Sequence, residues 1–138
     1  MRTAFVLATS FALSLGNAIP ALANCPVING TYTISIAQDD GTLKRRIRHY
    51  TRVERGVTSY TFGMNNTDEY FIADGKPHPI SRGGFQAMLT IRCEDGAVQF
   101  SVRENDADNW LWMKPAGPGL LEVRYGGFPE KNGIYRLE

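Results

Sequence analysis

The side chains with the clearest potential for chemistry lie in a basic stretch over residues 42–54. Arg45 and His49 are four positions apart in it, so an extended chain points both side chains to the same face. Leu43 and Ile47 share that face, which indicates that it turns inward. The stretch therefore predicts a strand that carries a guanidinium and an imidazole on its buried side.

Buried charged groups need polar partners, because an unpaired one destabilises the fold by several kcal/mol. Inside a small barrel, Arg45 and His49 could instead hold the polar head of a ligand. The apolar body of that ligand would lie against Tyr60, Phe62 and Met64, which share one face of the next extended segment. The alternative is that a bulge or the strand end places Arg45 and His49 in water.

A second candidate surface is the segment 109–113, which is apolar on both faces of an extended chain. Trp110 and Trp112 lie on one of these faces. A strand of a small barrel has one dry and one wet face, so something must cover the tryptophans. The candidates are the Gly/Pro-rich loop at residues 126–129, a partner protein or a ligand. An exposed pair would be a binding patch, because tryptophan is frequent in interface hot spots.

The outward face of the basic stretch could bind phosphate or an acidic partner. It could equally be a solvated face that acids on neighbouring strands neutralise. Residues 94–108 hold five acids and one base, which offers an internal counterpart. If the two regions are not adjacent, the molecule is electrically polarised. The residues of this face are Lys44, Arg46, Arg48, Tyr50, Arg52 and Glu54.

The remaining side chains offer little for catalysis or metal binding. The sequence has no G-x-S-x-G and no H-E-x-x-H motif. His78 lies between Pro77 and Pro79, and His49 is the only other histidine, whereas a metal site needs three or four ligands. We therefore expect no enzyme activity, no cofactor and no bound metal.

The first 23 residues have the pattern of an export signal. A single charge at Arg2 precedes an apolar run over residues 4–15, which is too short to span a bilayer, and Ala21-Leu22-Ala23 forms a small-x-small cleavage site. Cleavage leaves 138 − 23 = 115 residues, which predicts a single domain over residues 24–138 without a membrane span. We expect the protein to be secreted or periplasmic.

Export makes a disulfide between Cys25 and Cys93 the expected state of the only two cysteines. Their spacing suits neither a C-x-x-C redox motif nor a zinc cluster. The mature chain has 15 − 1 = 14 basic and 14 acidic residues. A formally neutral domain lacks the field with which nucleic-acid binders gather phosphate, so nucleic acid is not an expected partner.

The mature sequence alternates between short extended segments and turns. Thr31–Ala37 has strict two-residue periodicity. Asp74-Gly75 is a good hairpin dipeptide, and Glu94-Asp95-Gly96 predicts a further turn. The arm at Pro77–Pro79 is an edge or a loop, because proline cannot donate to a ladder. About nine short strands result. We predict an all-β fold, an antiparallel up-and-down meander closed into a barrel of about eight or nine strands; a sandwich is the alternative.

The two ends of the mature chain resemble the calycins, the group of small barrels that includes the lipocalins. Gly30-Thr31-Tyr32 is similar to the Gly-x-Trp that opens their first strand, and Gly133-Ile134-Tyr135-Arg136 is similar to their closing segment. The resemblance implies that Arg136 stacks across Tyr32 at the closed end of the barrel. Taken together, these features predict an exported, non-enzymatic binding protein for a small apolar or amphipathic ligand. The alternative is a protein–protein module, such as an inhibitor of an envelope hydrolase, that binds through loops or the Trp110/Trp112 strand.

Overall fold

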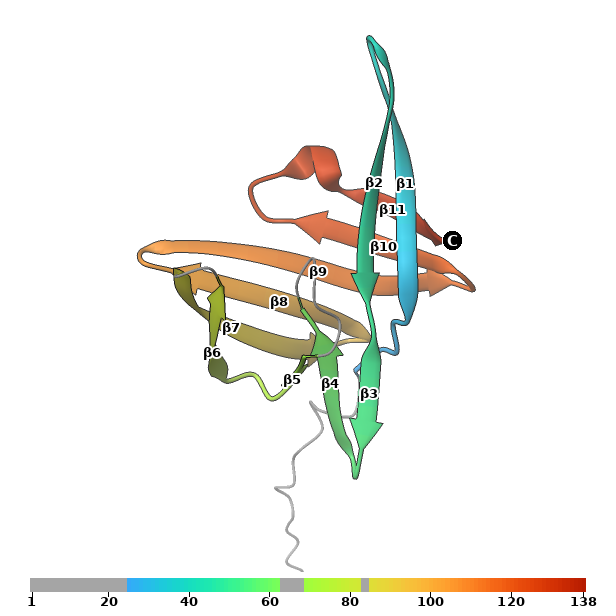
Figure 1. Ribbon diagram of the computed structural model, residues 1–138. Coiled ribbons are helices and arrows are strands. Elements are labelled where there is room, and N and C mark those ends of the chain that lie inside the picture. Colours follow the sequence, from blue (N-terminus) through green and yellow to red (C-terminus); the bar gives the residue numbers. More distant parts are fainter. Residues whose placement is uncertain (1–24, 63–68, 83–84) are drawn as a thin grey trace, which may run out of the picture.

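A computed structural model describes residues 25–62, 69–82 and 85–138, and within them the chain is almost entirely antiparallel β-structure (Figure 1). The expected leader over residues 1–23 lies outside the described residues. The strands are β1 (Gly30–Gln38), β2 (Gly41–His49), β3 (Thr51–Glu54), β4 (Val57–Thr61), β5 (Tyr70–Ile72), β6 (Pro77–Arg82), β7 (Phe85–Glu94), β8 (Ala97–Glu104), β9 (Ala107–Gly117), β10 (Leu120–Tyr125) and β11 (Gly133–Leu137). A 3-10 turn, η3 (Pro129–Lys131), precedes β11.

The strands pair as a meander in two sheets. The larger sheet has eight strands in the order β2-β1-β11-β10-β9-β8-β7-β6, and the smaller has the order β3-β4-β5. Pairing of β1 with β11 joins the beginning of the domain to its end. Short turns set the register; at the β7–β8 turn, Asp95 and Gly96 both have positive φ (53° and 79°), as a two-residue hairpin turn requires. The all-β antiparallel prediction is therefore confirmed.

The predicted closed barrel is not formed, because neither sheet of the described chain closes on itself. The expected strand over residues 42–54 divides at Tyr50. Beyond this residue the chain leaves β1 and turns to β4, where the Tyr50 N–H donates to Thr61 Oγ1 (2.9 Å) and its carbonyl accepts from the Thr61 N–H (3.0 Å). The strand count is consequently eleven in the described chain rather than nine.

A second interruption separates β5 from β6, which pair with β4 and β7 but not with each other. The arm with two prolines is thus a strand, and it takes the edge position that proline tolerates. Because Pro77 and Pro79 have no N–H, they leave the free edge of β6 short of donors for a ladder to β5. The link between the sheets is made by the connection from β5 to β6: the Ala73 N–H donates to Thr58 O and the Gly75 N–H to Ile91 O, both at 2.9 Å.

The core lies between the inner face of the eight-stranded sheet and the three-stranded sheet. Its largest fully buried side chains are Tyr60, Tyr135, Phe100, Ile28, Leu89, Ile91 and Met113. The β1–β2 hairpin extends beyond the other strands, so its tip lies away from this core (Figure 1).

The predicted disulfide is present and fastens the start of the described chain to the core. Cys25 is bonded to Cys93 of β7, with the two Cα atoms 5.0 Å apart. Beside it, the Tyr60 hydroxyl donates to the carbonyl of Pro26. The start of the segment that leads into β1 is therefore fixed by a covalent bond at Cys25 and by a hydrogen bond at Pro26.

The implied stack of Arg136 on Tyr32 is not formed. Arg136 pairs with Thr33, whereas Tyr32 pairs with Leu137. Residues directly opposite in an antiparallel pair share a face, and successive residues alternate. Tyr32 therefore points into the core, where it is buried, while Arg136 points to the opposite, exposed face.

Candidate functional site

Arg45 turns inward from β2, as the sequence predicts. Its Nε atom is buried and has no hydrogen-bond partner among the described residues. The guanidinium lies near Tyr125 of β10 and Tyr135 of β11, which belong to the same sheet as β2. Burial raises the pKa of Tyr125 to about 12 and also raises the pKa of Tyr135, and in both cases the charge of Arg45 works against the rise. Arg45 is therefore a cation whose buried Nε has no hydrogen-bond partner among the described residues.

His49 also turns inward, and its Nδ1 has a hydrogen-bond partner. The ring is buried, and its Nδ1 lies 3.1 Å from Thr61 O, to which an Nδ1–H donates. Burial lowers the pKa of His49, and the hydrogen bond to Thr61 offsets only part of that effect. His49 is thus a neutral core histidine that joins the end of β2 to β4.

Phe100 of β8 occupies the place where we expected the apolar body of a ligand. Its ring centroid lies 5.1 Å from that of His49, 5.7 Å from that of Tyr60 and 5.8 Å from that of Phe62. The structure therefore brings three of the predicted ligand-binding residues together around one aromatic ring, while Met64 lies outside the described residues. The alternation of Val98, Phe100 and Val102 is the signal that marks Phe100 as inward.

Trp110 and Trp112 lie on the outer face of the large sheet, away from these residues. The Trp110 indole lies against Gly126, where an added Cβ would come within 2.3 Å of its Nε1. The loop at residues 126–129 thus covers part of the pair, as one of the sequence-based alternatives requires. Trp110 nevertheless keeps 39% of its surface exposed, and Trp112 lies under the Arg124 guanidinium, 4.7 Å from its ring centroid.

Basic side chains on the outward face of residues 42–54 contact nearby residues and not the acids of residues 94–108. Arg46 pairs with Glu138 (3.0 Å), and Arg52 lies 3.9 Å from the Tyr70 ring centroid. Four strands separate β2 from β8 in the sheet order, so the acids of residues 94–108 lie on a different part of the sheet. The two regions are not adjacent, which leaves the charge of the sheet distributed unevenly.

His78 is paired with Asp74, which was not among the predicted site residues. Its Nε2 lies 2.9 Å from Asp74 Oδ1 and 3.1 Å from Oδ2, and Asp74 Oδ1 also accepts the Lys76 N–H at 2.9 Å. Partial burial works to raise the pKa of the Asp74 carboxyl, but these hydrogen bonds outweigh it and the pKa is lowered. The pair closes the connection between β5 and β6, where the two sheets meet.

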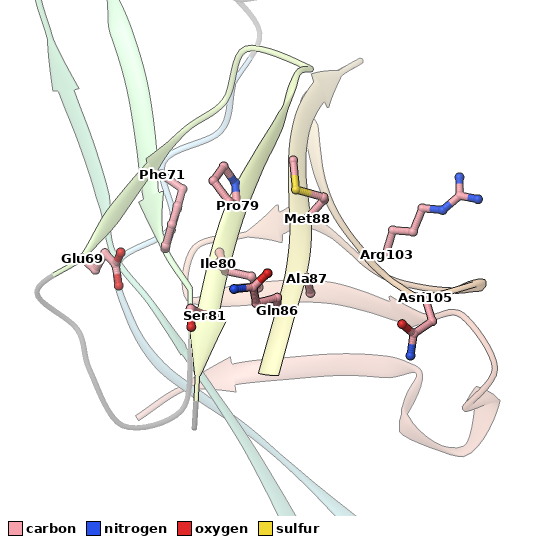
Figure 2. Close-up of a pocket in the computed structure, with 10 residues that line it drawn as sticks. All are labelled: Glu69, Phe71, Pro79, Ile80, Ser81, Gln86, Ala87, Met88, Arg103 and Asn105. Atoms are coloured by element: carbon pink, nitrogen blue, oxygen red, sulfur yellow. The ribbon is translucent and has the colours of Figure 1, made fainter. Parts of the chain in front are cut away.

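A hollow of about 770 Å³ lies beside this junction, at the seam where β5 and β6 are unpaired (Figure 2). Figure 2 shows Phe71 of β5 facing β6 across the seam, with Arg103 and Asn105 at the far end of the lining. The lining of the hollow mixes apolar and polar side chains, with Glu69 at one end and Arg103 and Asn105 at the other (Figure 2). Its lining comprises Phe71, Pro79, Ile80, Ala87 and Met88 together with Glu69, Ser81, Gln86, Arg103 and Asn105.

None of the six predicted ligand-binding residues lines this hollow. Arg45, His49, Tyr60, Phe62, Trp110 and Trp112 all lie elsewhere, so their role in binding stays a prediction. The hollow depends on two strands failing to pair, and that is a property of the assembled sheet rather than of any one segment. The only local signal for it is the proline pair that makes β6 an edge.

Within residues 25–62, 69–82 and 85–138, no three His, Cys, Asp or Glu side chains lie close enough together to hold a metal ion. The same part of the chain has no helix with the length and apolar character needed to cross a membrane. Comparison of the chain with protein-family models, with curated proteins and with solved structures finds no match.

Proposed function

We propose that this protein is an exported, non-enzymatic binding protein that holds a small amphipathic molecule in the hollow between β5 and β6. The observation that carries the proposal is the hollow itself. Its volume of about 770 Å³ lies within the range of roughly 300–1,000 Å³ that is typical of small-molecule sites. A mixed lining of this kind suits a ligand with an apolar body and polar ends.

The arrangement of the lining suggests how such a ligand would lie. Phe71, Ile80 and Ala87 supply apolar surface at the seam, where strand pairing is interrupted. Arg103 makes no hydrogen bond or ion pair within the described residues, so its guanidinium is available to an anionic end. Glu69 lines the site as well and would disfavour a second anionic group beside it.

The packing of the interior supports the seam over the centre of the molecule as the binding place. Tyr60 and Phe100 are both almost fully buried and occupy the space between the sheets. A ligand at the centre would have to displace them, whereas one in the seam would not. The proposed export is supported by the Cys25–Cys93 disulfide, since such bonds persist in oxidising compartments.

We keep the calycin resemblance as a proposal about fold family. It is supported by the meander, in which consecutive strands pair in both sheets, and by the pairing of the first strand with the last. Fold alone says little about function, so the binding proposal rests on the hollow and not on this resemblance.

Native mass spectrometry of the chain purified from its producing cell tests the proposed function. We expect a retained small molecule of defined mass. Ala87→Leu, which adds bulk to the buried lining of the hollow, should release it. Val57→Leu, a change of similar size at an exposed site on β4, is the matched control and should retain it. A chain that carries no molecule, or equal retention by the two variants, contradicts the proposal.

A further inference from the structure

We propose that the outer face of β7–β10 binds an acidic oligosaccharide, that is, a short chain of sugar rings bearing carboxylate groups. This tryptophan face consists of Trp110, Trp112, Gln99, Ser101, Arg92 and Arg124. It shares no residue with the hollow at the seam and is proposed independently of it, although Arg103 and Met88 of the hollow lie one row away on the same face.

The tryptophan face is ordered by strand register. Arg124, Trp112, Gln99 and Arg92 lie directly opposite one another on β10, β9, β8 and β7. Trp110 pairs with Ser101 in the next row of the same face. With strands about 4.8 Å apart and same-face residues about 7 Å apart along each strand, the face spans roughly 14 by 7 Å. Its chemistry is thus fixed by the sheet and not by mobile loops.

Trp110 forms an aromatic platform that the backbone supports. The absence of a side chain at Gly126 lets the indole lie against the main chain, and the Gly126 N–H donates to Trp110 O at 2.9 Å. With 39% of its surface exposed, the ring remains open to a ligand. The apolar C–H face of a sugar ring fits such a surface, because its partial positive charges meet the negative face of the indole.

The neighbours of the indoles suit a hydroxyl-rich ligand. Gln99 Nε2 donates to Ser101 Oγ (3.3 Å), which orients an amide and a hydroxyl between the two rows. Both side chains are half-buried, so they remain within reach of a ligand. An apolar partner would leave these groups without hydrogen bonds, and that is costly, whereas sugar hydroxyls can both donate and accept.

The charges at the two ends of the row favour an acid. Arg92 is exposed and makes no hydrogen bond or ion pair within the described residues, although Glu94 follows two positions later on the same face. Arg124 is different, since it is paired with Glu122 (Nη2 to Oε1, 2.8 Å) and lies over the Trp112 ring, 4.7 Å from its centroid. Arg92 is therefore the cation that a ligand carboxylate would meet, in the paired geometry that guanidinium offers.

The size of the face distinguishes this ligand from a protein partner. A stable protein interface covers about 800 Å² on each side, far more than a patch of roughly 14 by 7 Å. Two or three sugar rings match that length. The sequence also allowed an envelope protein on this strand, and such a partner becomes an outcome of the test.

The two tryptophans of the chain both lie on this face, so intrinsic tryptophan fluorescence reports on it alone. We expect trigalacturonic acid, the probe, to change the emission in a saturable way. Galactotriose, the neutral counterpart without carboxylates, should bind at least about tenfold more weakly. The preference should weaken as salt is raised, because exposed charges are screened.

Variants separate this proposal from non-specific binding. Arg92→Gln should bring the affinities for the acidic and neutral probes to within about twofold, and Arg92→Lys should restore part of the difference. Arg48→Gln, on the outer face of β2, is the matched control and should change neither affinity. Trp110→Ala should abolish binding of both probes while thermal unfolding shows a folded chain; if it does not fold, the Arg92 variants decide.

Four results would overturn the proposal: no saturable response to trigalacturonic acid, equal affinity for the two probes, an unchanged preference in Arg92→Gln, or a response to polyglutamate but not to the sugar. The last result would point to an acidic protein surface as the partner of this face. Because the emission of Trp110 and Trp112 reports on this face and neither residue lines the hollow, none of these outcomes bears on the amphipathic ligand of the hollow.

Discussion

The ring of His49 on β2 packs at a tilt against the ring of Phe100 on β8, with ring centroids 5.1 Å apart and planes inclined by 30°. The two strands are five positions apart in the sheet order, so this contact crosses the interior instead of following the sheet. It places a titratable ring in the buried core. The contact therefore links the stability of the fold to pH.

Unfolding should become easier as pH falls below 6.5 because of His49. Burial lowers its pKa from 6.5 in the folded state, so below that pH the unfolded chain binds more protons and stability falls, by up to about 1.4 kcal/mol per pH unit. The loss continues until the lowered pKa is reached. Urea unfolding between about pH 7 and about pH 5 measures it.

His49→Gln should flatten this pH dependence, since an amide can still donate to Thr61 O but does not titrate in this range. His78→Gln removes the other histidine and should keep the slope. An equally steep slope in His49→Gln would show that the pH dependence arises elsewhere.

The disulfide should be a major part of stability. Cys25 and Cys93 are 68 residues apart, and closing a loop of that length constrains the unfolded chain by about 4 kcal/mol in the entropy model. The double variant Cys25→Ser/Cys93→Ser should lower the free energy of unfolding by this order. Unfolding of the parent chain with a reductant should match the double variant, and equal stability with and without reductant would contradict the prediction.

Gly126→Ala should disturb the tryptophan face and the fold together. The new methyl group would meet the Trp110 indole, which must move, and overpacking of this kind costs about 1–3 kcal/mol. The tryptophan emission should shift toward that of exposed indole. In a Trp110→Ala background the same substitution should cost much less, and additive costs would mean that the contact is not responsible.

Asp74→Asn should weaken the connection between the two sheets. The carboxylate accepts from His78 and from the Lys76 N–H, and a partly exposed pair of this kind contributes about 0.5–1 kcal/mol. Because its pKa is lowered, the contribution is complete above the ordinary value of 3.8 and disappears as pH falls below it. Urea unfolding at neutral and acid pH checks both statements, with the exposed turn variant Asp39→Asn as control.

Local pattern was enough to predict most of the strands and the direction of their faces. The alternation in Thr31–Ala37 became β1, and His49 and Arg45 turn inward from β2 as their spacing requires. The disulfide followed from the count of cysteines. In each case the deciding information lies within a few residues or in the composition.

What could not be predicted depends on which strands meet. The division at Tyr50 arises because Thr61, on another strand, takes both of its backbone groups. Phe100 fills the interior because the sheet curves until β8 faces β2. The sequence of any single strand does not predict that curvature. The open seam likewise depends on the absence of pairing between β5 and β6, which the prolines permit but do not require.

Arg45→Met should leave the fold as stable as before or stabilise it by about 1 kcal/mol. The buried Nε has no hydrogen-bond partner among the described residues, and a buried polar group without one opposes folding, whereas methionine keeps the apolar stem. Arg48→Met, on the exposed face of the same strand, is the matched control and should be nearly neutral. Urea unfolding compares the three chains, and a loss above about 1 kcal/mol in Arg45→Met would mean that Arg45 is well paired in solution. If native mass spectrometry also shows less retained ligand in Arg45→Met than in Arg48→Met, the cation is kept for binding at the expense of stability; equal retention would exclude Arg45 as the polar handle that its sequence position predicts.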